Sequence, residues 1–252
     1  MPLTQPEFTV SFAQTEDEHL EALRLRYDVF VREFGTAGQG VDHQARIESD
    51  AFDAHALHLL LKDRGRVVGV YRLLDEARAK AAGGFYSEAE FDLGPLLSSG
   101  RKLLELGRSC LHPDYRGGQA MLLLWSAVSD HVIATKTEIL FGTASFQGTD
   151  TKAIGPSLAL LSENHRAPPD LRAVAVGPDA LAYSDITMPV EDRRAAMLKV
   201  PSLIKAYLRL GGFVGDGAFV DHAFNSTDVL LILDVARMTE SQRAVYSKRT
   251  PA

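Results

Sequence analysis

The sequence is poor in cysteine and has no long apolar run. Cys110 is the only cysteine among 252 residues, which excludes an internal disulfide and a cysteine-based metal cluster and fits a reducing cytoplasm. No apolar stretch approaches the roughly 18 residues that a membrane-spanning helix needs. The first 12 residues lack a basic segment followed by an apolar core, so we expect no secretory signal. We therefore expect a cytoplasmic protein without a metal site.

Basic residues are fewer than acidic ones. The chain has 27 Lys and Arg against 33 Asp and Glu, a net charge of −6, and this balance argues against a general nucleic-acid binder. Hydrophobic residues make up 46% of the chain and charged residues 24%, which is typical of globular rather than disordered proteins. The length allows one large domain or two small ones.

Hydrophobic patterning predicts alternating strands and helices. The first strand is expected over 8–12, and Thr15 followed by three acids predicts a helix that ends at Gly35. Apolar runs on both sides of 62–65 predict a hairpin. Later strands are expected over 103–111, 138–146 and 228–234, and later helices from Gln119, after Gly148 and within 193–210. We interpret 36–56 as a loop, and the whole order favours an α/β fold.

The stretch 103–125 concentrates the chemistry. Glu105 and Arg108 lie in an otherwise apolar strand, where a charged side chain is costly unless it is paired or used. The strand leads into a basic, glycine-rich turn that opens a helix, and such a turn suits a phosphate because its N–H groups and the helix dipole point at the anion. The candidate phosphate ligands are Arg116, Gly117, Gly118 and Gln119.

Two further groups of residues each allow two interpretations. Arg26, Phe30 and Glu33 stand at i, i+4 and i+7 and share a helix face, a spacing that also suits a solvated ion pair. A later segment without acids suits docking to an acidic partner or a membrane surface, or equally a solvated helix face. Its basic residues are Arg193, Arg194, Lys199, Lys205 and Arg209.

Several motifs resemble the acyl-carrier-protein-dependent branch of the GNAT N-acyltransferases, which includes the acyl-homoserine lactone synthases. Motifs of those synthases fall on Arg26 with Phe30, on Asp50 with Asp53, on Arg72, and on Glu105 with Arg108. Over roughly residues 20–235 the chain also resembles the bacterial ornithine lipid N-acyltransferases. That resemblance is carried by residues 105–110, 113–116, 140–150, 201–211, 213–217 and 224–228.

The resemblance implies one domain over 1–252, with its core over about 8–235 and a polar tail over 236–252. The implied fold is a mixed, mainly antiparallel sheet flanked by helices. The implied reaction is transfer of a fatty acyl group, typically 3-hydroxyacyl, from the phosphopantetheine thioester of acyl carrier protein to the α-amine of L-ornithine. Lyso-ornithine lipid would be the product, no cofactor would be bound covalently, and peripheral contact with the inner membrane is compatible with this activity. The later glycines of the CoA phosphate loop are missing after Arg116, which disfavours CoA as the donor.

Within this resemblance Glu105 is our candidate general base, acting directly or through a water. In the alternative, Glu105 pairs with Arg108 or Arg72 and only orders the pocket. Strict alternation would place Glu105 and Arg108 on opposite faces, so we expect a bulge near Gly107. Such a bulge would free an N–H near Ser109 or Cys110 for the tetrahedral oxyanion.

Candidate ligands of the amino acid are Arg26, Phe30, Glu33, Asp50, Asp53 and Arg72. Carboxylates suit the two amines of ornithine, and an arginine suits its carboxylate. Covalent catalysis by Cys110 is disfavoured because no basic partner is evident and a lone cysteine is more often a core residue.

Three other functions compete with this interpretation. The same chemistry could serve an acyl-homoserine lactone or another long-chain N-acyl amino acid. The fold could be a non-catalytic module for docking to an acyl carrier or a membrane, or it could be a CoA-dependent acetyltransferase.

Overall fold

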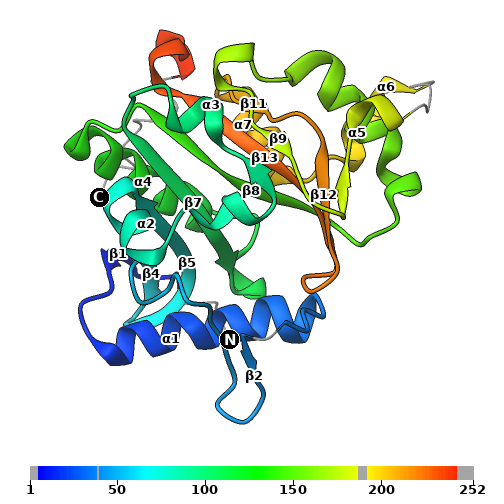
Figure 1. The fold of residues 1–252 in the computed structure, drawn as a ribbon. Coiled ribbons are helices and arrows are strands. Elements are labelled where there is room, and N and C mark those ends of the chain that lie inside the picture. The colour runs from blue at the N-terminus through cyan, green and yellow to red at the C-terminus, as the bar shows by residue number, and fades with distance from the viewer. Residues whose placement is uncertain (1–4, 39, 187–191, 243–252) are drawn as a thin grey trace.

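The computed structural model describes residues 5–38, 40–186 and 192–242, and a large β-sheet forms its centre (Figure 1). In chain order its nine strands are β1 (Phe8–Phe12), β4 (Leu57–Asp63), β5 (Arg66–Asp75), β7 (Leu103–Leu111), β8 (Ile139–Gln147), β10 (Ala180–Leu181), β11 (Phe213–Val214), β12 (Ala218–Asp221) and β13 (Ser226–Asp234). Two small sheets pair β2 (Val41–Asp42) with β3 (Ile47–Glu48), and β6 (Phe91–Asp92) with β9 (Val174–Ala175).

The order of the large sheet is β1-β4-β5-β7-β8-β13-β12-β10, and β11 also pairs with β13. Its strand pairs are antiparallel except for β7 and β8, which are parallel. The expected mixed, mainly antiparallel sheet is therefore confirmed. The hairpin of β4 and β5 turns at Arg64 and Gly65, both with positive φ, as the apolar runs around it predicted.

The helices flank the sheet. In chain order they are α1 (Glu16–Arg26), α2 (Glu76–Ala82), α3 (Gly94–Leu97), α4 (Ala120–Thr135), α5 (Thr151–His165), α6 (Arg193–Lys199) and α7 (Ser202–Arg209). Short 3-10 turns are η2 (Tyr86–Ala89), η3 (Pro113–Tyr115), η4 (Pro169–Leu171), η5 (Tyr183–Asp185) and η6 (Val235–Arg237). Of the helices within the described ranges, none has the length and apolar character to cross a membrane.

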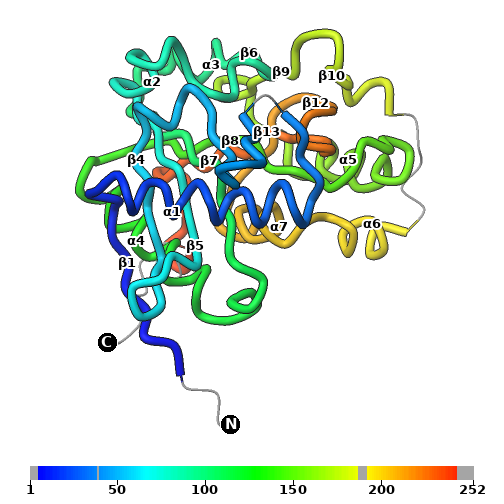
Figure 2. Tube along the Cα trace, turned by 90° about the horizontal axis from the view of Figure 1, so that it is seen from below, coloured from blue at the N-terminus to red at the C-terminus, as the bar shows by residue number. Residues whose placement is uncertain are grey.

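Each face of the sheet has its own core. On one face α4, α5 and α7 pack over the strands. On the other face α1 covers β4 and β5, and the segment from α2 to α3 covers β8 and β13. Figure 2 shows the strands between α2 and α3 at the top and α4 and α7 at the bottom. Functional side chains on either face are thus held by a packed layer.

The first helix is longer and less regular than the sequence predicts. Thr15 caps α1 as expected, because its hydroxyl accepts a hydrogen bond from Glu18 N. After Arg26 the chain continues as a π-helical segment, η1 (Tyr27–Glu33), and Gly35 follows with φ of +79°. A π-helix is rare and shifts the register of its side chains relative to an α-helix. The expected shared face of Arg26, Phe30 and Glu33 requires a regular α-helix, so it does not describe their actual arrangement.

Strands β7 and β8 diverge after a short paired stretch. They pair only from Leu103 to Glu105 on β7 and from Ile139 to Phe141 on β8. Gly142 follows at once, and a Cβ there would come within 2.0 Å of the Leu106 carbonyl oxygen. Glycine therefore permits the close backbone approach at the point where the strands part.

Residues 36–56 differ from the loop that we expected, and a second irregular segment joins β5 to β7. Residues 36–56 contain the small β2–β3 hairpin, and the end of β3 carries Glu48, which is buried. Residues 75–100 form α2, η2, β6 and α3 in close succession. Most of the polar tail expected over 236–252 lies outside the described residues.

Candidate active site

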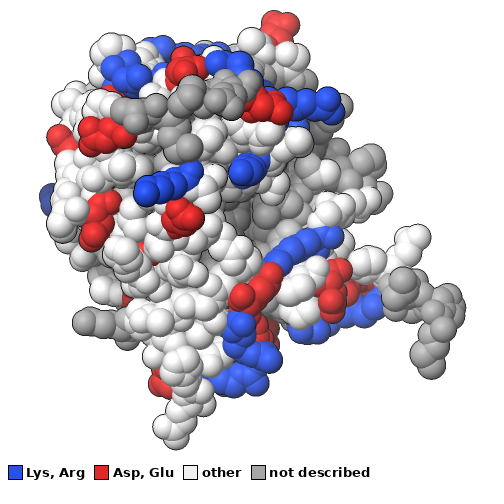
Figure 3. Space-filling view, turned by 90° about the vertical axis from the view of Figure 1, so that its right-hand side faces the viewer, with Lys and Arg blue, Asp and Glu red and all other residues white. Residues whose placement is uncertain are grey.

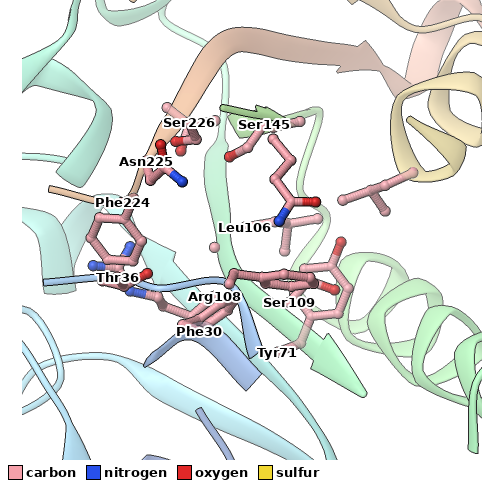
Figure 4. Close-up of a pocket in the computed structure, with 16 residues that line it drawn as sticks. Phe30, Thr36, Tyr71, Leu106, Arg108, Ser109, Ser145, Phe224, Asn225 and Ser226 are labelled. Carbon is pink, nitrogen blue, oxygen red and sulfur yellow. The ribbon is translucent and has the colours of Figure 1, made fainter. Parts of the chain in front are cut away.

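A cavity of about 270 Å³ opens where β7 and β8 part. One wall comes from η1, β5 and β7, and the other comes from β8, α7 and the start of β13. Figure 4 shows Arg108, Ser109 and Tyr71 across the cavity from Ser145, Asn225 and Ser226. The lining residues are Phe30, Phe34, Thr36, Tyr71, Leu106, Gly107, Arg108, Ser109, Thr143, Ala144, Ser145, Gln147, Leu203, Phe224, Asn225 and Ser226. A mixed polar and apolar cleft of this kind suits a small polar substrate joined to an apolar one.

The expected bulge in β7 is present. Arg72 of β5 lies opposite Gly107 and Val70 lies opposite Cys110, so two residues of β7 face the single residue Tyr71. Arg108 sits in the bulge with φ of +48°, a conformation that is costly for a non-glycine residue and clusters at functional sites. The bulge turns Arg108 and Ser109 toward the cavity.

The Arg108 guanidinium is held from all sides. Its Cζ lies 4.6 Å from the ring centre of Tyr86 and 4.5 Å from that of Phe224. Its Nε donates to Glu48 Oε1 at 3.2 Å and its Nη2 donates to Asp50 Oδ2 at 2.9 Å. The stacking and the two charge-assisted bonds fix the guanidinium plane at the cavity wall.

Arg26 and Arg72 join the same network of buried charges. Arg26 is fully buried and donates to Glu48 Oε2 and Asp53 Oδ1, both at 2.6 Å. Arg72 donates to Asp50 Oδ1 at 2.5 Å and to Asp53 Oδ1 at 3.0 Å. The nearby guanidinium groups hold the pKa of Asp53 well below its usual range, although burial alone would raise it. Three arginines thus balance the three carboxylates of Glu48, Asp50 and Asp53.

The structure brings together Arg26, Asp50, Asp53 and Arg72 of the residues expected to bind the amino acid and pairs them with one another. Asp53 and Arg26 are almost inaccessible, whereas the Asp50 side chain is 21% exposed. Glu48, which the sequence pattern placed only among the acids of a loop, completes the network. A structural pairing of this type holds the wall of a site more than it binds a ligand.

Phe30 lines the cavity, but Glu33 does not. Glu33 instead accepts two hydrogen bonds from Arg116, at 2.5 and 2.7 Å, and the guanidinium of Arg116 lies over the ring of Phe34. This ion pair holds the pKa of Glu33 below its usual value. Because Phe34 lines the cavity, the basic turn lies close to the cavity mouth.

The turn after β7 leaves the start of α4 without a side-chain cap. Gly117 has φ of +78°, Gln119 makes no capping hydrogen bond, and the first turn of α4 carries no acid. An uncapped helix N-terminus retains free N–H donors. Of the four residues predicted to bind phosphate, Arg116 contacts Phe34 of the cavity wall and is engaged by Glu33, and Gly117 to Gln119 follow it at the start of α4.

Glu105 lies beneath the η2 turn. Its Oε2 accepts from Tyr86 N at 2.8 Å, and its Oε1 accepts from Ser87 N at 2.8 Å and also from the Ser87 hydroxyl. Burial raises the pKa of Glu105, and the three hydrogen bonds from Tyr86 and Ser87 partly offset this effect. Glu105 lines a small space of about 10 Å³ beside Arg72, Tyr86 and Arg108 rather than the main cavity. The alternative in which Glu105 forms an ion pair with Arg72 or Arg108 is not what the described residues show.

Two residues near the bulge, Ser109 and Cys110, have different surroundings. The Ser109 hydroxyl lines the cavity and has no hydrogen-bond partner among the described residues. Cys110 packs against the α1 core, and burial raises the pKa of its thiol to about 12. A thiol in this state is a poor nucleophile, which agrees with the interpretation of Cys110 as a core residue.

The basic segment expected to dock a partner forms α6 and α7. Arg193 pairs with Glu163 at 2.8 Å, and the Lys205 ammonium donates to the Leu198 carbonyl at 3.3 Å. Arg194, Lys199 and Arg209 are exposed. Figure 3 shows basic and acidic side chains interspersed on the face drawn there, not one continuous basic patch.

Sequence reasoning missed several residues around the cavity. Tyr86 and Ser87 hold Glu105, and the Tyr86 ring stacks on Arg108, but both residues lie in a segment without a clear pattern. Glu90, Asp221 and Asp228 form a group whose carboxylate oxygens lie within 4.8 Å of one another, an arrangement able to hold a cation. Asp228 could have been found, because a carboxylate in the apolar strand 228–234 is the same signal that marked Glu105.

Comparison with known proteins identifies the family. An acetyltransferase (GNAT) domain model matches residues 25–126. An L-ornithine N(alpha)-acyltransferase of Rhodobacter capsulatus is 50% identical over 252 residues, covering 96% of this chain and 95% of that protein. The chain belongs to the L-ornithine N(alpha)-acyltransferase family. A further member from Agrobacterium fabrum is 38% identical and covers 93% of this chain and 83% of its own length.

Solved structures agree on the fold of this L-ornithine N(alpha)-acyltransferase family member. The CoA-dependent acyl-homoserine lactone synthase BjaI aligns with a TM-score of 0.54 at 16% identity, over 95% of this chain and 88% of its own. The N-acyl amino acid synthase FeeM aligns with a TM-score of 0.50 at 12% identity, over 95% of this chain and 98% of its own. The chain is therefore an N-acyltransferase with a GNAT-like fold, as the motifs predicted.

Proposed function

We propose that the chain transfers a fatty acyl group, typically 3-hydroxyacyl, from the phosphopantetheine thioester of acyl carrier protein to the α-amine of L-ornithine. The product is lyso-ornithine lipid. The observation that carries this proposal is the 50% identity, over almost the whole of both chains, to a relative named for acylation of the ornithine α-amine. The cavity between β7 and β8 supports it, because an open cleft there gives two substrates a common meeting point.

The donor arm enters beside the basic turn. Arg116, Gly117, Gly118 and Gln119 offer one cation and an uncapped helix N-terminus to a single phosphodiester. This arrangement suits the one phosphate of an acyl carrier better than a pyrophosphate, since the later glycines of the CoA loop are absent. The exposed basic residues Arg194, Lys199 and Arg209 on α6 and α7 would face an acidic carrier or a membrane surface.

The acyl chain lies toward α7. On that side the cavity continues into an apolar space lined by Leu140, Leu203, Tyr207 and Leu231. This space measures only about 20 Å³. A long hydrocarbon therefore fits only if α7 moves away from the sheet. Apolar side chains of the strands and of α7 would then enclose the hydrocarbon.

The reaction is a direct attack of the amine on the thioester. The α-ammonium of the acceptor first loses a proton, and its nitrogen then attacks the thioester carbonyl carbon. The tetrahedral oxyanion forms near the β7 bulge, where Ser109 and the backbone N–H groups at 109–110 are the candidate donors. The nitrogen then gives up a second proton, the oxyanion re-forms the carbonyl as the C–S bond breaks, and the departing phosphopantetheine thiolate takes up a proton, which leaves the amide.

Glu105 has two parts in this scheme. Its hydrogen bonds to Tyr86 and Ser87 hold the ring that stacks on Arg108. A carboxylate has about four acceptor sites, and the structure accounts for three of them, so one remains to receive the amine proton through a water. The raised pKa of Glu105 favours this second part, because a more basic carboxylate is a better proton acceptor near neutral pH.

An assay with purified components tests the proposal. Acyl carrier protein thioesters of several chain lengths, and the matching CoA thioesters, are offered with a panel of amino acids, and products are identified by mass spectrometry. We expect Nα-acyl-ornithine from the carrier thioesters. Turnover of acetyl-CoA, or a product with another amino acid only, would refute the proposal, as would failure to turn over any thioester.

A further inference from the structure

Three carboxylates beside the cavity take no part in the arginine network. Glu90 follows η2, Asp221 ends β12, and Asp228 lies within β13. Glu90 and Asp228 are 4% and 5% exposed, whereas Asp221 is half-buried and one of its oxygens caps the backbone at Ala223 and Phe224. Three ionised carboxylates this close together, and largely shielded from water, repel one another strongly.

No cationic side chain in the described part of the chain forms an ion pair with this group. No ion pair joins Glu90, Asp221 or Asp228 to a lysine, arginine or histidine among those residues, and Glu90 Oε2 and Asp228 Oδ1 are buried without a hydrogen-bond partner. The side chains of Ser145 and Ser226 lower the pKa of Asp228, and Arg108 is near enough to lower the pKa of both Glu90 and Asp228. Two of the Arg108 donors are engaged by Glu48 and Asp50 instead. Buried carboxylate oxygens without partners are costly, and a ligand with positive charge would offset that cost.

The three carboxylates adjoin the cavity along the face of β13 that carries Asp228. Asp228 lies opposite Ser145 in the pairing of β13 with β8, and Ser226 lies two residues earlier on the same face of β13. Ser145 and Ser226 both line the cavity, and the Ser226 hydroxyl is a further buried group without a hydrogen-bond partner. Asp228 is therefore a neighbour of Ser145 and Ser226, which Figure 4 shows at the wall of the cavity.

We propose that Glu90, Asp221 and Asp228 bind the side-chain ammonium group of the acceptor amino acid, an inference that rests on the proposed function. An ammonium offers three N–H donors. At ordinary hydrogen-bond lengths, tetrahedral donors place their acceptors about 4.6 Å apart, and the carboxylate oxygens here lie within 4.8 Å of one another. The three carboxylates match the three donors in number, and the upper limit on their separation is compatible with one shared ammonium.

This binding mode explains why the α-amine is the one that reacts. Three carboxylates stabilise the charged form of the amine that they hold, and a protonated amine has no lone pair for attack. The α-amine, at the other end of the acceptor, remains at the cavity where it can lose its proton. The subsite therefore selects acceptors with a cationic side chain and protects that side chain from acylation.

The empty subsite holds a proton in place of the ligand. Burial raises the pKa of Glu90 to about 9, and the negative charges of Asp228 and Asp221 contribute to the rise. Burial also raises the pKa of Asp228 to about 6. Binding of an ammonium would displace the proton, so calorimetry should detect proton release when a cationic acceptor binds at neutral pH.

The test compares L-ornithine with L-norvaline, which has the same carbon chain and no side-chain amine. The wild-type chain is expected to favour ornithine by roughly 100-fold or more in kcat/KM, because a site built for a polar group rejects the analogue that lacks it. Asp228→Asn and Glu90→Gln should each lower kcat/KM for ornithine by at least tenfold, mainly through KM, and leave norvaline within about threefold. Asp130→Asn, an exposed acid on α4, is the matched control.

The outcomes separate this inference from the proposed function. If lysine or another diamino acid replaces ornithine as the acceptor, the proposed function fails and the subsite stands. If the preferred acceptor has a neutral side chain, or if both variants lose ornithine and norvaline activity equally, the subsite is refuted. A requirement for added Mg²⁺ that Asp228→Asn abolishes for both acceptors would make the group a metal site and also overturn it. If no acceptor is turned over, calorimetric binding of ornithine and norvaline decides in the same way.

The melting temperature shows whether the variants lose activity because they lose the ligand or because the fold is less stable. Removing a buried carboxylate that has no partner should leave the melting temperature of the ligand-free chain unchanged or raise it. Ornithine should raise the melting temperature of the wild type more than norvaline does, and Asp228→Asn should abolish this difference. A fall in the melting temperature of both variants without ligand would indicate that the acids stabilise the fold, contrary to the proposal.

Discussion

Arg26 Nε lies 2.6 Å from Glu48 Oε2, and both side chains are almost completely buried. The other oxygen of Glu48 accepts from Arg108 Nε at 3.2 Å. One carboxylate therefore connects the first helix to the β7 bulge. The ion pairs that hold Arg108 in the bulge therefore extend to the first helix. Removing one member leaves its buried partners with uncompensated charge, which should lower the stability of the fold.

Arg26→Met should lower the free energy of unfolding by about 3–5 kcal/mol, because Glu48 and Asp53 would lose a buried partner. Arg24→Met removes a charge from the exposed side of the same helix and should change stability by no more than about 0.5 kcal/mol. Urea denaturation of both variants measures the difference. Equal effects would show that the buried network contributes little.

Glu105→Gln should reduce kcat by about 10²–10⁴-fold and remove the acidic limb of the kcat/KM pH profile, because the amide cannot take up the amine proton. Ser87→Ala removes a hydrogen bond that lowers the pKa of Glu105. That variant should keep the acidic limb and move it to higher pH. The measurement is kcat/KM against pH for the wild type and both variants.

The same profiles distinguish a base from a positioning residue. If Glu105→Gln lowers the rate at every pH and leaves the limb in place, Glu105 acts only through the Tyr86–Ser87 turn. The proton would then leave by another route.

Cys110→Ala should retain acyl transfer within about threefold, because the buried thiol with a pKa of about 12 takes no part in the chemistry. The small cavity left in the α1 core should cost about 1 kcal/mol of stability. Rate measurements and urea denaturation check the two effects. An acyl-enzyme on Cys110, seen by mass spectrometry of the wild type but not of the variant, would contradict direct transfer.

His58 should make the fold sensitive to acid. Burial lowers its pKa to about 4, against the opposing attraction of Asp53, while His19 and Arg26 add to the lowering. The unfolded chain takes up this proton near pH 6.5 and the folded chain does not, so stability falls as pH falls between about 6.5 and 4. The expected loss is about 3 kcal/mol.

His58→Gln isolates this effect, because other titrating groups such as Glu90 are common to both chains. The difference in the free energy of unfolding between wild type and variant, measured at pH 7 and pH 4.5, should shrink toward acid. A difference that does not change with pH would show that His58 is already accessible to protons in the folded chain.

Much of the architecture follows from local pattern. Alternation marked β1, the apolar runs around Arg64 and Gly65 marked the β4–β5 hairpin, and the cap residue Thr15 marked the start of α1. The bulge was predictable because Glu105 and Arg108 are three residues apart in one strand, and Gly142 marked the close approach of β8 to β7. These features depend on nearby residues, which is why the sequence reveals them.

The partners of the charged residues depend on tertiary contacts instead. Nothing local shows that Glu33 meets Arg116, 83 positions later, or that Ser87 meets Glu105. After the π-helical turn Phe30 lines the cavity and Glu33 pairs with Arg116, an arrangement that α-helical spacing does not predict. The carboxylate group of Glu90, Asp221 and Asp228 joins three separate segments, and no spacing rule connects them.

The most direct test of the central claim, that the amide forms in the gap between β7 and β8, is a crystal structure of the chain with an Nα-acyl-ornithine bound. We expect the amide between the Arg108–Ser109 bulge and the Ser145–Ser226 wall, with the side-chain ammonium at Asp228 and the hydrocarbon directed toward Leu203 on α7. An amide bound elsewhere on the chain, with the cavity between β7 and β8 filled only by water, would contradict the account.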